Sequence, residues 1–183
     1  MKRLLFTTLL LTGLCTCVSA QKKAAPEKIN PVVPDFGGVY AIPEATVIPD
    51  STIEYKIVVD VKTGGQKPTN FSAGLYNVAR LLNLHEAGGG FNDQMDVVLA
   101  IHGGATYSIL DNAAYKAKFG VDNPNIDLIR QLKVAGVQLT VCGQSLIARK
   151  IDPKTVLGEV DIATSMLTTV ATCQMKGFAV LQF

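Results

Sequence analysis

The stretch from residue 137 to residue 150 constrains the fold of this chain most strongly. Residues 137–142 (VQLTVC) are rich in apolar and β-branched side chains, which predicts a buried strand that ends at Cys142. Gly143 permits a tight turn, and residues 144–150 then predict a short helix. Such a turn places the thiol at the edge of a sheet, facing the first amides of the helix, whose dipole favours a thiolate. Cys142 is therefore a candidate functional residue, and its alternative role is that of a small buried apolar side chain.

Strand and helix patterns alternate from residue 53 onward. Residues 53–61 alternate apolar and more polar side chains, and residues 95–101 form an apolar run typical of a strand buried on both faces. Alternating strands and helices imply right-handed crossovers. The sequence thus predicts one three-layer α/β domain with a mostly parallel five-stranded sheet and helices on both faces. The remaining predicted elements are strands at 137–142, 160–163 and 178–183, helices capped by Ser72, Asp111 and Asn125, and a helix over 165–176.

Residues 1–20 have the pattern of a secretory signal peptide. A basic start precedes the apolar run 4–14, which is too short to span a bilayer, and a small-x-small cleavage pattern ends before Gln21. A lipoprotein is the alternative, because Cys15 and Cys17 follow the apolar run, although the residues before them fit a lipobox poorly. We therefore expect an exported protein of the bacterial periplasm. No later segment is long and apolar enough for a membrane helix.

Residues 21–52 predict an arm or linker rather than a regular element. Five prolines in this segment prevent a regular helix. The apolar content of residues 36–42 favours partial docking on a folded domain over a solvated tether. The predicted α/β domain then occupies residues 53–183.

The mature chain is expected to be electrically neutral. Removal of residues 1–20 leaves 163 residues with 15 basic and 15 acidic side chains. This balance gives no support to a nucleic-acid partner or to a basic membrane-binding face. Two cysteines remain, Cys142 and Cys173, which is too few for a disulfide scaffold. In an oxidising compartment the two could pair as a redox switch, or either could stay a thiol.

A second strand end carries a reactive side chain, because His102 directly follows the strand at 95–101. Ligands of open α/β sheets bind at the carboxyl ends of the strands. His102 is therefore a candidate base or hydrogen-bond partner, with a purely structural role as the alternative. The positions that flank the two candidate side chains are candidate ligand-binding residues: Gly103, Gly143, Gln144 and Ser145.

Several motifs of other chemistries are absent from the sequence. Cys142 does not belong to a C-x-x-C motif, and the chain has no G-x-G-x-x-G motif, no P-loop lysine and no complete nucleophile elbow. His85 and Cys173 fall within predicted helices, where packing roles are expected. The histidines and cysteines do not have ligand spacing, so we expect neither a metal site nor a cofactor.

The motifs around Cys142 and His102 resemble those of the DsrE/DsrF-like (YchN-type) sulfur-relay family. The likeness rests on the strand, cysteine and glycine turn at 141–146, the Ile-Asp-Pro at 151–153, the strand end Ala-Ile-His-Gly at 100–103 and the closing helix and strand around 176–180. It covers residues 53–183, which is most of the mature chain.

The resemblance implies a compact α/β domain of the DsrE type that assembles into homo-oligomers, such as trimers or hexamers. In sulfur-relay members, a cysteine in this loop carries a persulfide and passes its sulfane sulfur to a partner protein. This role falls on Cys142 and implies a sulfur-carrier protein as partner. The sulfur-relay members act in the cytoplasm, whereas this chain carries an export signal.

Two hypotheses of different classes follow. In the first, Cys142 binds or transfers sulfane sulfur as a persulfide, and His102 supports it, so that replacing His102 by alanine should raise the thiol pKa. In the second, the protein is a non-catalytic oligomeric module that holds a small ligand near these two residues. Oligomerisation is expected in both, because the apolar stretches 36–42 and 107–110 have no obvious place in a single three-layer core and are expected to cover a neighbouring subunit.

Overall fold

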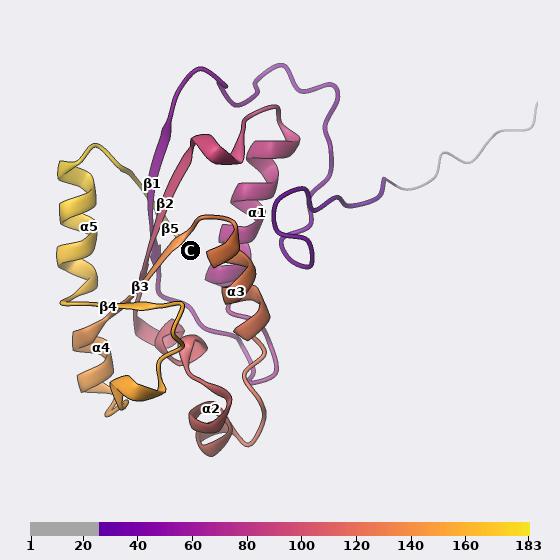
Figure 1. Cartoon of the computed structure of the whole chain (residues 1–183). Helices are drawn as coiled ribbons and strands as arrows, with labels where there is room; N and C mark the ends of the chain where they lie inside the picture. Colours follow the sequence, from indigo (N-terminus) through magenta and orange to yellow (C-terminus); the bar gives the residue numbers. More distant parts are fainter. Residues whose placement is uncertain (1–25) are drawn as a thin grey trace, which may run out of the picture.

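The structure is a computed structural model that describes residues 26–183. The expected signal peptide and the first residues of the arm lie outside this range. The described chain forms a five-stranded sheet in the order β4-β3-β2-β1-β5, and every neighbouring pair is parallel (Figure 1). This confirms the predicted α/β fold class. The strands are β1 (Tyr55–Val61), β2 (Met95–Ile101), β3 (Gln138–Cys142), β4 (Asp161–Ala163) and β5 (Ala179–Gln182).

Helices cover both faces of the sheet. Figure 1 shows α1 and α3 on one side, with α4 and α5 on the other. Three short 3-10 helices, η1 to η3, complete the fold. The helices are α1 (Ala73–Ala87), α2 (Asn112–Phe119), α3 (Ile126–Val134), α4 (Gly143–Ala148), α5 (Met166–Met175), η1 (Asn92–Gln94), η2 (Gly103–Ile109) and η3 (Pro153–Thr155).

Side-chain caps fix the starts of several helices. Ser72 and Asp111 accept backbone N–H groups of α1 and α2, as the sequence predicted. Asn125 occupies the capping position of α3 but makes no capping hydrogen bond. Its side-chain oxygen instead accepts the N–H of Ser72, and its amide donates to Asn123. The predicted cap of α3 is therefore a buried cross-link between two loops at the carboxyl edge of the sheet.

The two faces of the sheet are packed unequally. The face under α1 and α3 carries a continuous core from all three central strands, including Val59, Leu99 and Leu139. On the opposite face, a much smaller cluster joins Val58 and Val98 to Cys173 of α5. Successive side chains of a strand point to opposite faces of the sheet, so residues 60, 140 and 142 project from the same face as Val58 and Val98. This face holds the candidate site described below.

The expectation that residues 107–110 cover a neighbouring subunit is wrong. Residues 103–109 form η2, which the sequence did not predict, and Ile109 and Leu110 are buried in the main core of the same chain. Within the other stretch, Phe36 and Val39 are also buried in this chain, whereas Tyr40 and Ile42 are exposed. Most of the apolar surface in the two stretches is thus buried within this chain.

The described part of the arm docks on α1. Residues 29 and 39 form an isolated antiparallel bridge that closes the arm into a loop. The side chain of Asn83, buried on α1, accepts the N–H groups of Val32 and Val33, at 2.9 and 3.0 Å. Its amide donates to the carbonyl oxygens of Phe36 and Gly37. One helix residue therefore satisfies four backbone groups of a segment that has no regular structure of its own.

Candidate functional site

Cys142 lies where β3 ends and α4 begins. It is the last residue of the strand and the N-cap of the helix, and only 4 % of its surface is exposed. The turn needs glycine at the next position, because a Cβ on Gly143 would lie 2.9 Å from the carbonyl oxygen of Ala163 on β4. The sequence therefore sets the thiol into a narrow seam between β3, β4 and the helix that follows.

Polar groups from two helices surround the thiol. Burial raises the pKa of Cys142, but hydrogen bonds to the thiolate lower it by more than burial raises it, so the pKa lies below its ordinary value. These hydrogen bonds come from the backbone N–H of Met166, the hydroxyl and N–H of Ser145 and the hydroxyl of Ser165. Met166 is the first residue of α5, and Ser165 is its cap. The amino ends of α4 and α5 thus both face the sulfur, and both helix dipoles favour its negative form.

The contribution of α5 is the part of the site that sequence reasoning missed. Cys142 is paired with Ala163 across β3 and β4, and Ser165 follows two residues later. This register carries the start of α5 to the sulfur, where the thiol lies 3.9 Å from the Ser165 hydroxyl oxygen. The signal in the sequence was a helix cap placed directly after a short strand.

His102 lies at the carboxyl end of β2, as predicted, and its ring is held by a carboxylate. Nε2 of His102 lies 2.5 Å from Oδ1 of Asp60 on β1, and both side chains are largely shielded from solvent. The other carboxylate oxygen of Asp60 accepts the amide of Gln182 on β5 at 3.2 Å. A row of three polar side chains therefore crosses three strands, and Asp60 and Gln182 were not among the predicted residues.

Cys142 and His102 share one edge and one face of the sheet without bonding to each other. Ile101 of β2 is paired with Val141 of β3, so the next residue on each strand projects to the same side. Among the described residues, the hydrogen bond of His102 goes to Asp60, and none joins it to Cys142. His102 thus stands on the adjacent strand as a fixed group beside the thiol seam.

The remaining predicted site residues differ in their surroundings. Ser145 contributes directly to the thiol environment, whereas Gln144 is exposed. Gly103 adopts a φ of +56°, and a Cβ there would lie 2.9 Å from the carbonyl oxygen of Lys62, so it fixes the turn after β2. A cavity of about 390 Å³ lies beside this turn, lined by the loop 63–68 and by residues of η2 and α2, but not by the thiol.

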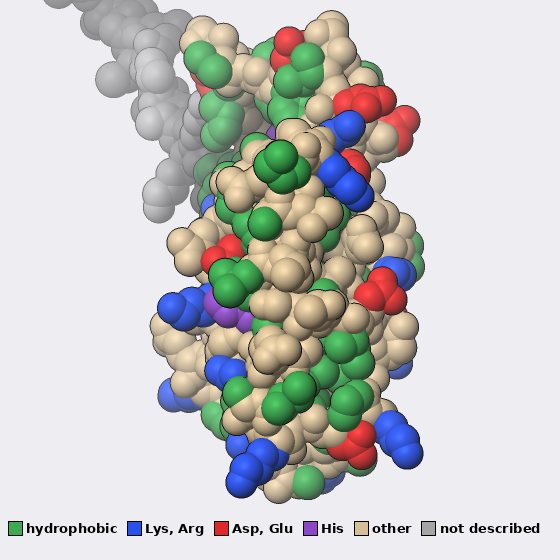
Figure 2. Space-filling view, turned by 90° about the vertical axis from the view of Figure 1, so that its left-hand side faces the viewer, with side chains coloured by type: hydrophobic (Ala, Val, Ile, Leu, Met, Phe, Trp, Pro, Cys, Tyr) green, Lys and Arg blue, Asp and Glu red, His purple; other side chains and the backbone are tan. Residues whose placement is uncertain are grey.

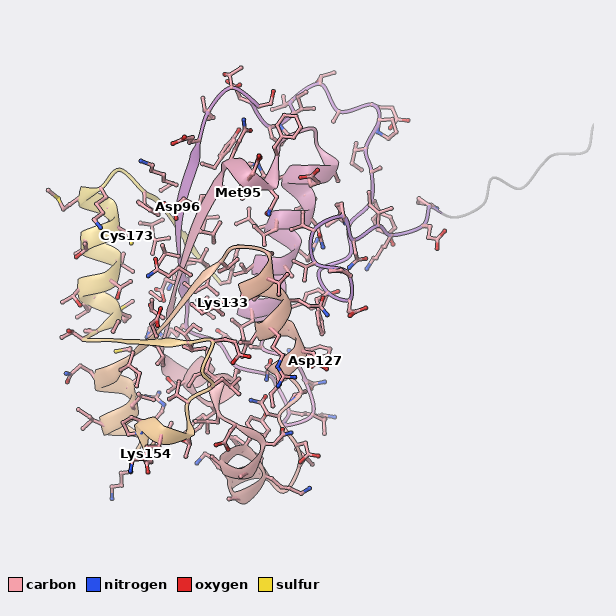
Figure 3. The ribbon with its side chains drawn as sticks, in the orientation of Figure 1. Met95, Asp96, Asp127, Lys133, Lys154 and Cys173 are labelled. Carbon is pink, nitrogen blue, oxygen red and sulfur yellow. The ribbon has the colours of Figure 1, made fainter. Side chains whose placement is uncertain are left out.

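Cys173 is a free, buried cysteine at the other end of α5. Burial raises the pKa of this thiol, with Lys176 lowering it and Asp96 raising it. Figure 3 shows Cys173 near Asp96, at the start of β2, whereas Cys142 lies at the carboxyl edge. Ser165, which touches Cys142, precedes Cys173 by eight residues, or about 12 Å of helix. A disulfide requires Cα atoms within about 7 Å, so the geometry contradicts a Cys142–Cys173 redox switch.

Residues 26–183 contain neither a cluster of metal-binding side chains nor a helix suited to span a membrane. In this range, no three side chains of the metal-binding types His, Cys, Asp and Glu come together. None of the helices described there has the length and apolar character needed to cross a bilayer.

The described domain matches a known class of α/β proteins. The model of the DsrE/DsrF-like family matches residues 56–183, and the chain belongs to this family. The sequence resemblance is thereby confirmed. Comparison with curated proteins gives no match.

Two solved structures are similar in fold. One is the protein of unknown function MTH1491 from Methanobacterium thermoautotrophicum, with a TM-score of 0.54, 17% identity, and coverage of 70% of this chain and 99% of that chain. The other is the YchN protein from E. coli, with a TM-score of 0.48, 18% identity, and coverage of 70% of this chain and 99% of that chain. At these identities the likeness concerns the fold alone.

Proposed function

We propose that this protein carries sulfane sulfur as a persulfide on Cys142. The observation that supports the proposal is the position of the thiol between the amino ends of α4 and α5, where its pKa lies below the ordinary value. A thiolate is the form of cysteine that attacks sulfur. Membership of the DsrE/DsrF-like family, whose members include sulfur-relay proteins, suggests the same role.

The proposed transfer needs no external oxidant or reductant. The Cys142 thiolate attacks the outer sulfur of a donor persulfide, R–S–SH. The S–S bond of the donor breaks as the new S–S bond forms on Cys142, and R–S⁻ leaves. The leaving thiolate then takes up a proton. We propose His102 as the proton donor, because it lies at the same edge of the sheet as Cys142 and is held in place by Asp60. Reversal with an acceptor thiolate, on a sulfur-carrier protein, releases the sulfur and regenerates Cys142.

The test is sulfur loading followed by intact mass measurement. Protein treated with a small-molecule persulfide should gain the mass of one sulfur atom, which a reductant then removes. Cys173→Ser should load like the natural chain, because its thiol lies at the far end of α5, whereas Cys142→Ser should not load. Equal loading of Cys142→Ser and the natural protein would overturn the proposal.

The role of His102 has its own test. His102→Ala should slow loading of Cys142 while leaving the extent of loading at equilibrium unchanged, because it removes a proton donor and not the sulfur acceptor. A shift of the thiol pKa in this variant would instead assign His102 to thiol activation. Unchanged loading rate and thiol pKa would return His102 to a structural role.

A second candidate function is that of a ligand-binding module without turnover. Two observations favour it: Cys142 is almost fully buried, and the cavity beside Gly103 at the same edge does not include the thiol. If Cys142 in folded protein reacts with a small alkylating reagent no faster than an ordinary buried cysteine, this function replaces sulfur transfer.

We also propose that the protein is an exported homo-oligomer. Apolar side chains are exposed along the face formed by α4, α5 and the edge strand β5, and Figure 2 shows hydrophobic side chains spread along the middle of this face. Burying this face between subunits would remove it from water. The exposed apolar residues of this face are Ile147, Leu167, Met175 and Val180.

Two measurements test this assembly and its location. Light scattering on the eluted protein at micromolar concentration should give a multiple of the chain mass, and Leu167→Glu should reduce it. A monomer would contradict the proposal. Intact mass of the exported protein should correspond to a chain that begins at Gln21, whereas a lipid-modified mass would identify a lipoprotein.

A further inference from the structure

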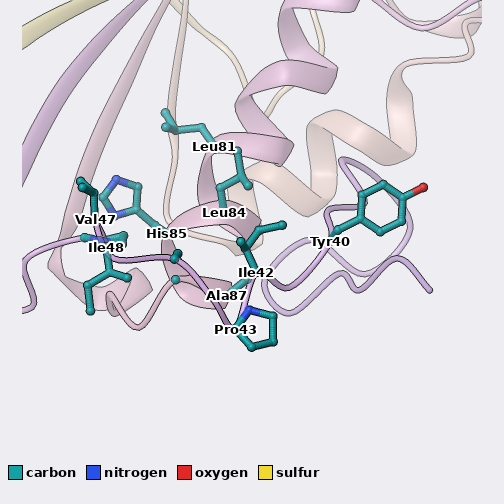
Figure 4. A pocket seen from close by; sticks show the side chains of 12 residues that line it. Tyr40, Ile42, Pro43, Val47, Ile48, Leu81, Leu84, His85 and Ala87 are labelled. Carbon is teal, nitrogen blue, oxygen red and sulfur yellow. The ribbon is translucent and has the colours of Figure 1, made fainter. Parts of the chain in front are cut away.

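Two of the cavities in the described chain differ in the charge of their lining. One, of about 610 Å³, lies between the arm and α1, and its lining has no Lys, Arg, Asp or Glu side chain (Figure 4). The other, of about 330 Å³, lies between α2 and the end of α4, beyond the carboxyl ends of β2 and β3 (Figure 1). Its volume is within the range of small-molecule sites, and it carries several charged side chains.

Three basic side chains line the smaller cavity: Lys118 of α2, and Arg149 and Lys150, which directly follow α4. Within residues 26–183, none of the three forms an ion pair with a carboxylate. The lining holds one carboxylate, Asp152, whose Oδ1 accepts the N–H of Lys154 as the cap of η3. Three positive charges and one negative charge leave the lining with a net charge of +2, which attracts anions.

The ring of Tyr107 on η2 holds two of these cations in place. Nζ of Lys118 lies 4.5 Å from the centre of the ring, and Cζ of Arg149 lies 5.9 Å from it. Both distances are within the reach of cation–π attraction. The ring is itself fixed, because it packs edge-on against Phe119 at 5.5 Å between centroids. Two like charges from different helices are thus gathered around one side chain, although they repel each other.

Lys150 adopts a backbone conformation that glycine adopts at lower cost. Its φ is +53°, and among the described residues it is the one non-glycine position with a positive φ. Its N–H donates to the carbonyl oxygen of Ile147, and the N–H of Ile151 donates to that of Leu146, which is the Schellman ending of a helix. Glycine is the usual residue at this position, so lysine here costs conformational free energy. The dipole of α4 favours a cation at its end, but Arg149 already supplies one. The fold therefore does not require the second cation.

The rest of the lining supplies apolar surface, from Leu110, Ala114, Ala117 and Ile151. Ala114 and Ala117 are three residues apart on α2, so they lie on the same face of the helix. Their small side chains leave a hollow that a longer side chain would fill. A ligand for this cavity therefore needs an apolar body as well as negative charge.

We propose that this cavity binds a small organic dianion, such as a phosphate monoester, that has an apolar body. Arg149, Lys118 and Lys150 bind the anionic group, because guanidinium and ammonium groups donate charge-assisted hydrogen bonds to phosphate oxygens. The net charge of +2 matches a dianion, and the alanines of α2 leave room for the body. Cys142 lies outside the lining, at the other end of α4, about 9 Å of helix away. The site is therefore independent of the sulfur chemistry proposed for Cys142.

Titration with the fluorescent phosphate monoester 1-naphthyl phosphate tests the proposal. One probe per chain should bind saturably at micromolar concentration. 1-Naphthol lacks the phosphate group and inorganic phosphate lacks the apolar body, so calorimetry should show that each binds at least tenfold more weakly. No saturable binding of 1-naphthyl phosphate, or equal affinity for either of the two simpler probes, would overturn the proposal.

Two variants test the cations. Arg149→Gln should weaken binding of 1-naphthyl phosphate at least tenfold. Its matched control is Lys154→Gln, which removes the same charge from an exposed position outside the lining and should bind the probe normally. Lys150→Gly should weaken binding several-fold while raising the temperature of thermal unfolding, because it removes a charge and relieves the backbone. Normal binding by Arg149→Gln or Lys150→Gly, or equal loss in Lys154→Gln, would overturn the proposal.

A third variant tests the hollow without changing the charge. Ala117→Leu should weaken binding of 1-naphthyl phosphate several-fold by filling the cavity, whereas Ala113→Leu, at an exposed position of the same helix outside the lining, should not. Equal binding by these two variants would contradict a site in the cavity. A smaller assembly mass for Arg149→Gln in light scattering would also overturn the proposal, by assigning the cations to an interface between copies. Cys142→Ser should bind the probe like the natural chain, so failure of the sulfur proposal leaves this site unaffected.

Discussion

The thiol of Cys142 lies 3.9 Å from the hydroxyl oxygen of Ser165, and the same oxygen accepts the N–H of Leu167 as the cap of α5. One hydroxyl group therefore caps the start of α5 and also contacts the candidate reactive sulfur. The two residues are 23 positions apart in the sequence and are brought together by the pairing of β3 with β4. The stability of α5 and the ionisation of Cys142 are coupled through this contact.

Ser165→Ala should change both properties. Loss of the cap should lower the free energy of unfolding by about 1 kcal/mol, and loss of the hydroxyl should raise the pKa of Cys142, because a group that lowers it is removed. Asp111→Ala is the matched control, since it removes the cap of α2 and lies outside the groups that shift the thiol. It should cost a similar amount of stability and leave the thiol pKa unchanged. An unchanged thiol pKa in Ser165→Ala would contradict the coupling.

The two cysteines should differ in the pH dependence of alkylation. The pKa of Cys142 is lowered, so its thiolate forms, and its rate of alkylation levels off, at a lower pH than that of an ordinary cysteine. Burial raises the pKa of Cys173, so its alkylation should begin only at higher pH. Rates measured on Cys173→Ala and Cys142→Ala report each thiol alone, and each variant serves as control for the other. Superimposable profiles would contradict the assignment.

The lowered pKa of Cys142 also predicts how the stability of the protein depends on pH. Because the folded-state pKa lies below that of the unfolded chain, folding is favoured by the thiolate at pH values above the unfolded pKa. This contribution is lost as the pH falls through the folded-state pKa. Replacing Cys142 by serine should therefore reduce stability more at alkaline pH than at neutral pH, as chemical denaturation at the two pH values would measure.

Local patterns were sufficient to predict the elements of the sheet. The bounds of β2 agree with the apolar run at 95–101, and the caps at Ser72 and Asp111 are formed by the predicted side chains. These features depend on neighbours in the sequence, on strand burial and on short-range hydrogen bonds. Residues 103–109 were missed because two glycines after a strand predict a turn, whereas packing against the core of the domain makes a 3-10 helix there.

The contacts of the candidate site could be predicted only in part. Cys142 and His102 were found from their places at strand ends, since the carboxyl ends of parallel strands meet at one edge. Their partners Ser165 and Asp60 were missed because both contacts depend on strand order and register, which the sequence patterns do not specify. The role of Asn83 was missed for the same reason, because its partners are backbone groups about 50 positions away.

Asn83→Ala should release the arm from the domain. The buried side chain makes four hydrogen bonds to the arm backbone, and their loss leaves those groups without partners. The free energy of unfolding should fall by about 2–3 kcal/mol, in line with the cost of unsatisfied buried groups. Limited proteolysis should then cleave within residues 26–50 much faster than in the natural protein. Asn77→Ala, at a partly buried position of the same helix with no side-chain hydrogen bond to the arm, is the control and should not accelerate cleavage.

Gly143→Ala should disturb the thiol seam directly. An added Cβ would lie 2.9 Å from the carbonyl oxygen of Ala163, so β4 or the turn must shift, at a cost of about 1–3 kcal/mol. The shift would move the amino end of α5 relative to Cys142, because Ser165 follows β4 after one residue. The thiol pKa should therefore rise as well. Gly158→Ala is the control, since a Cβ there meets no atom within 4 Å, and it should change neither stability nor thiol pKa appreciably. Equal effects of the two substitutions would show that the close approach at Gly143 does not position the site.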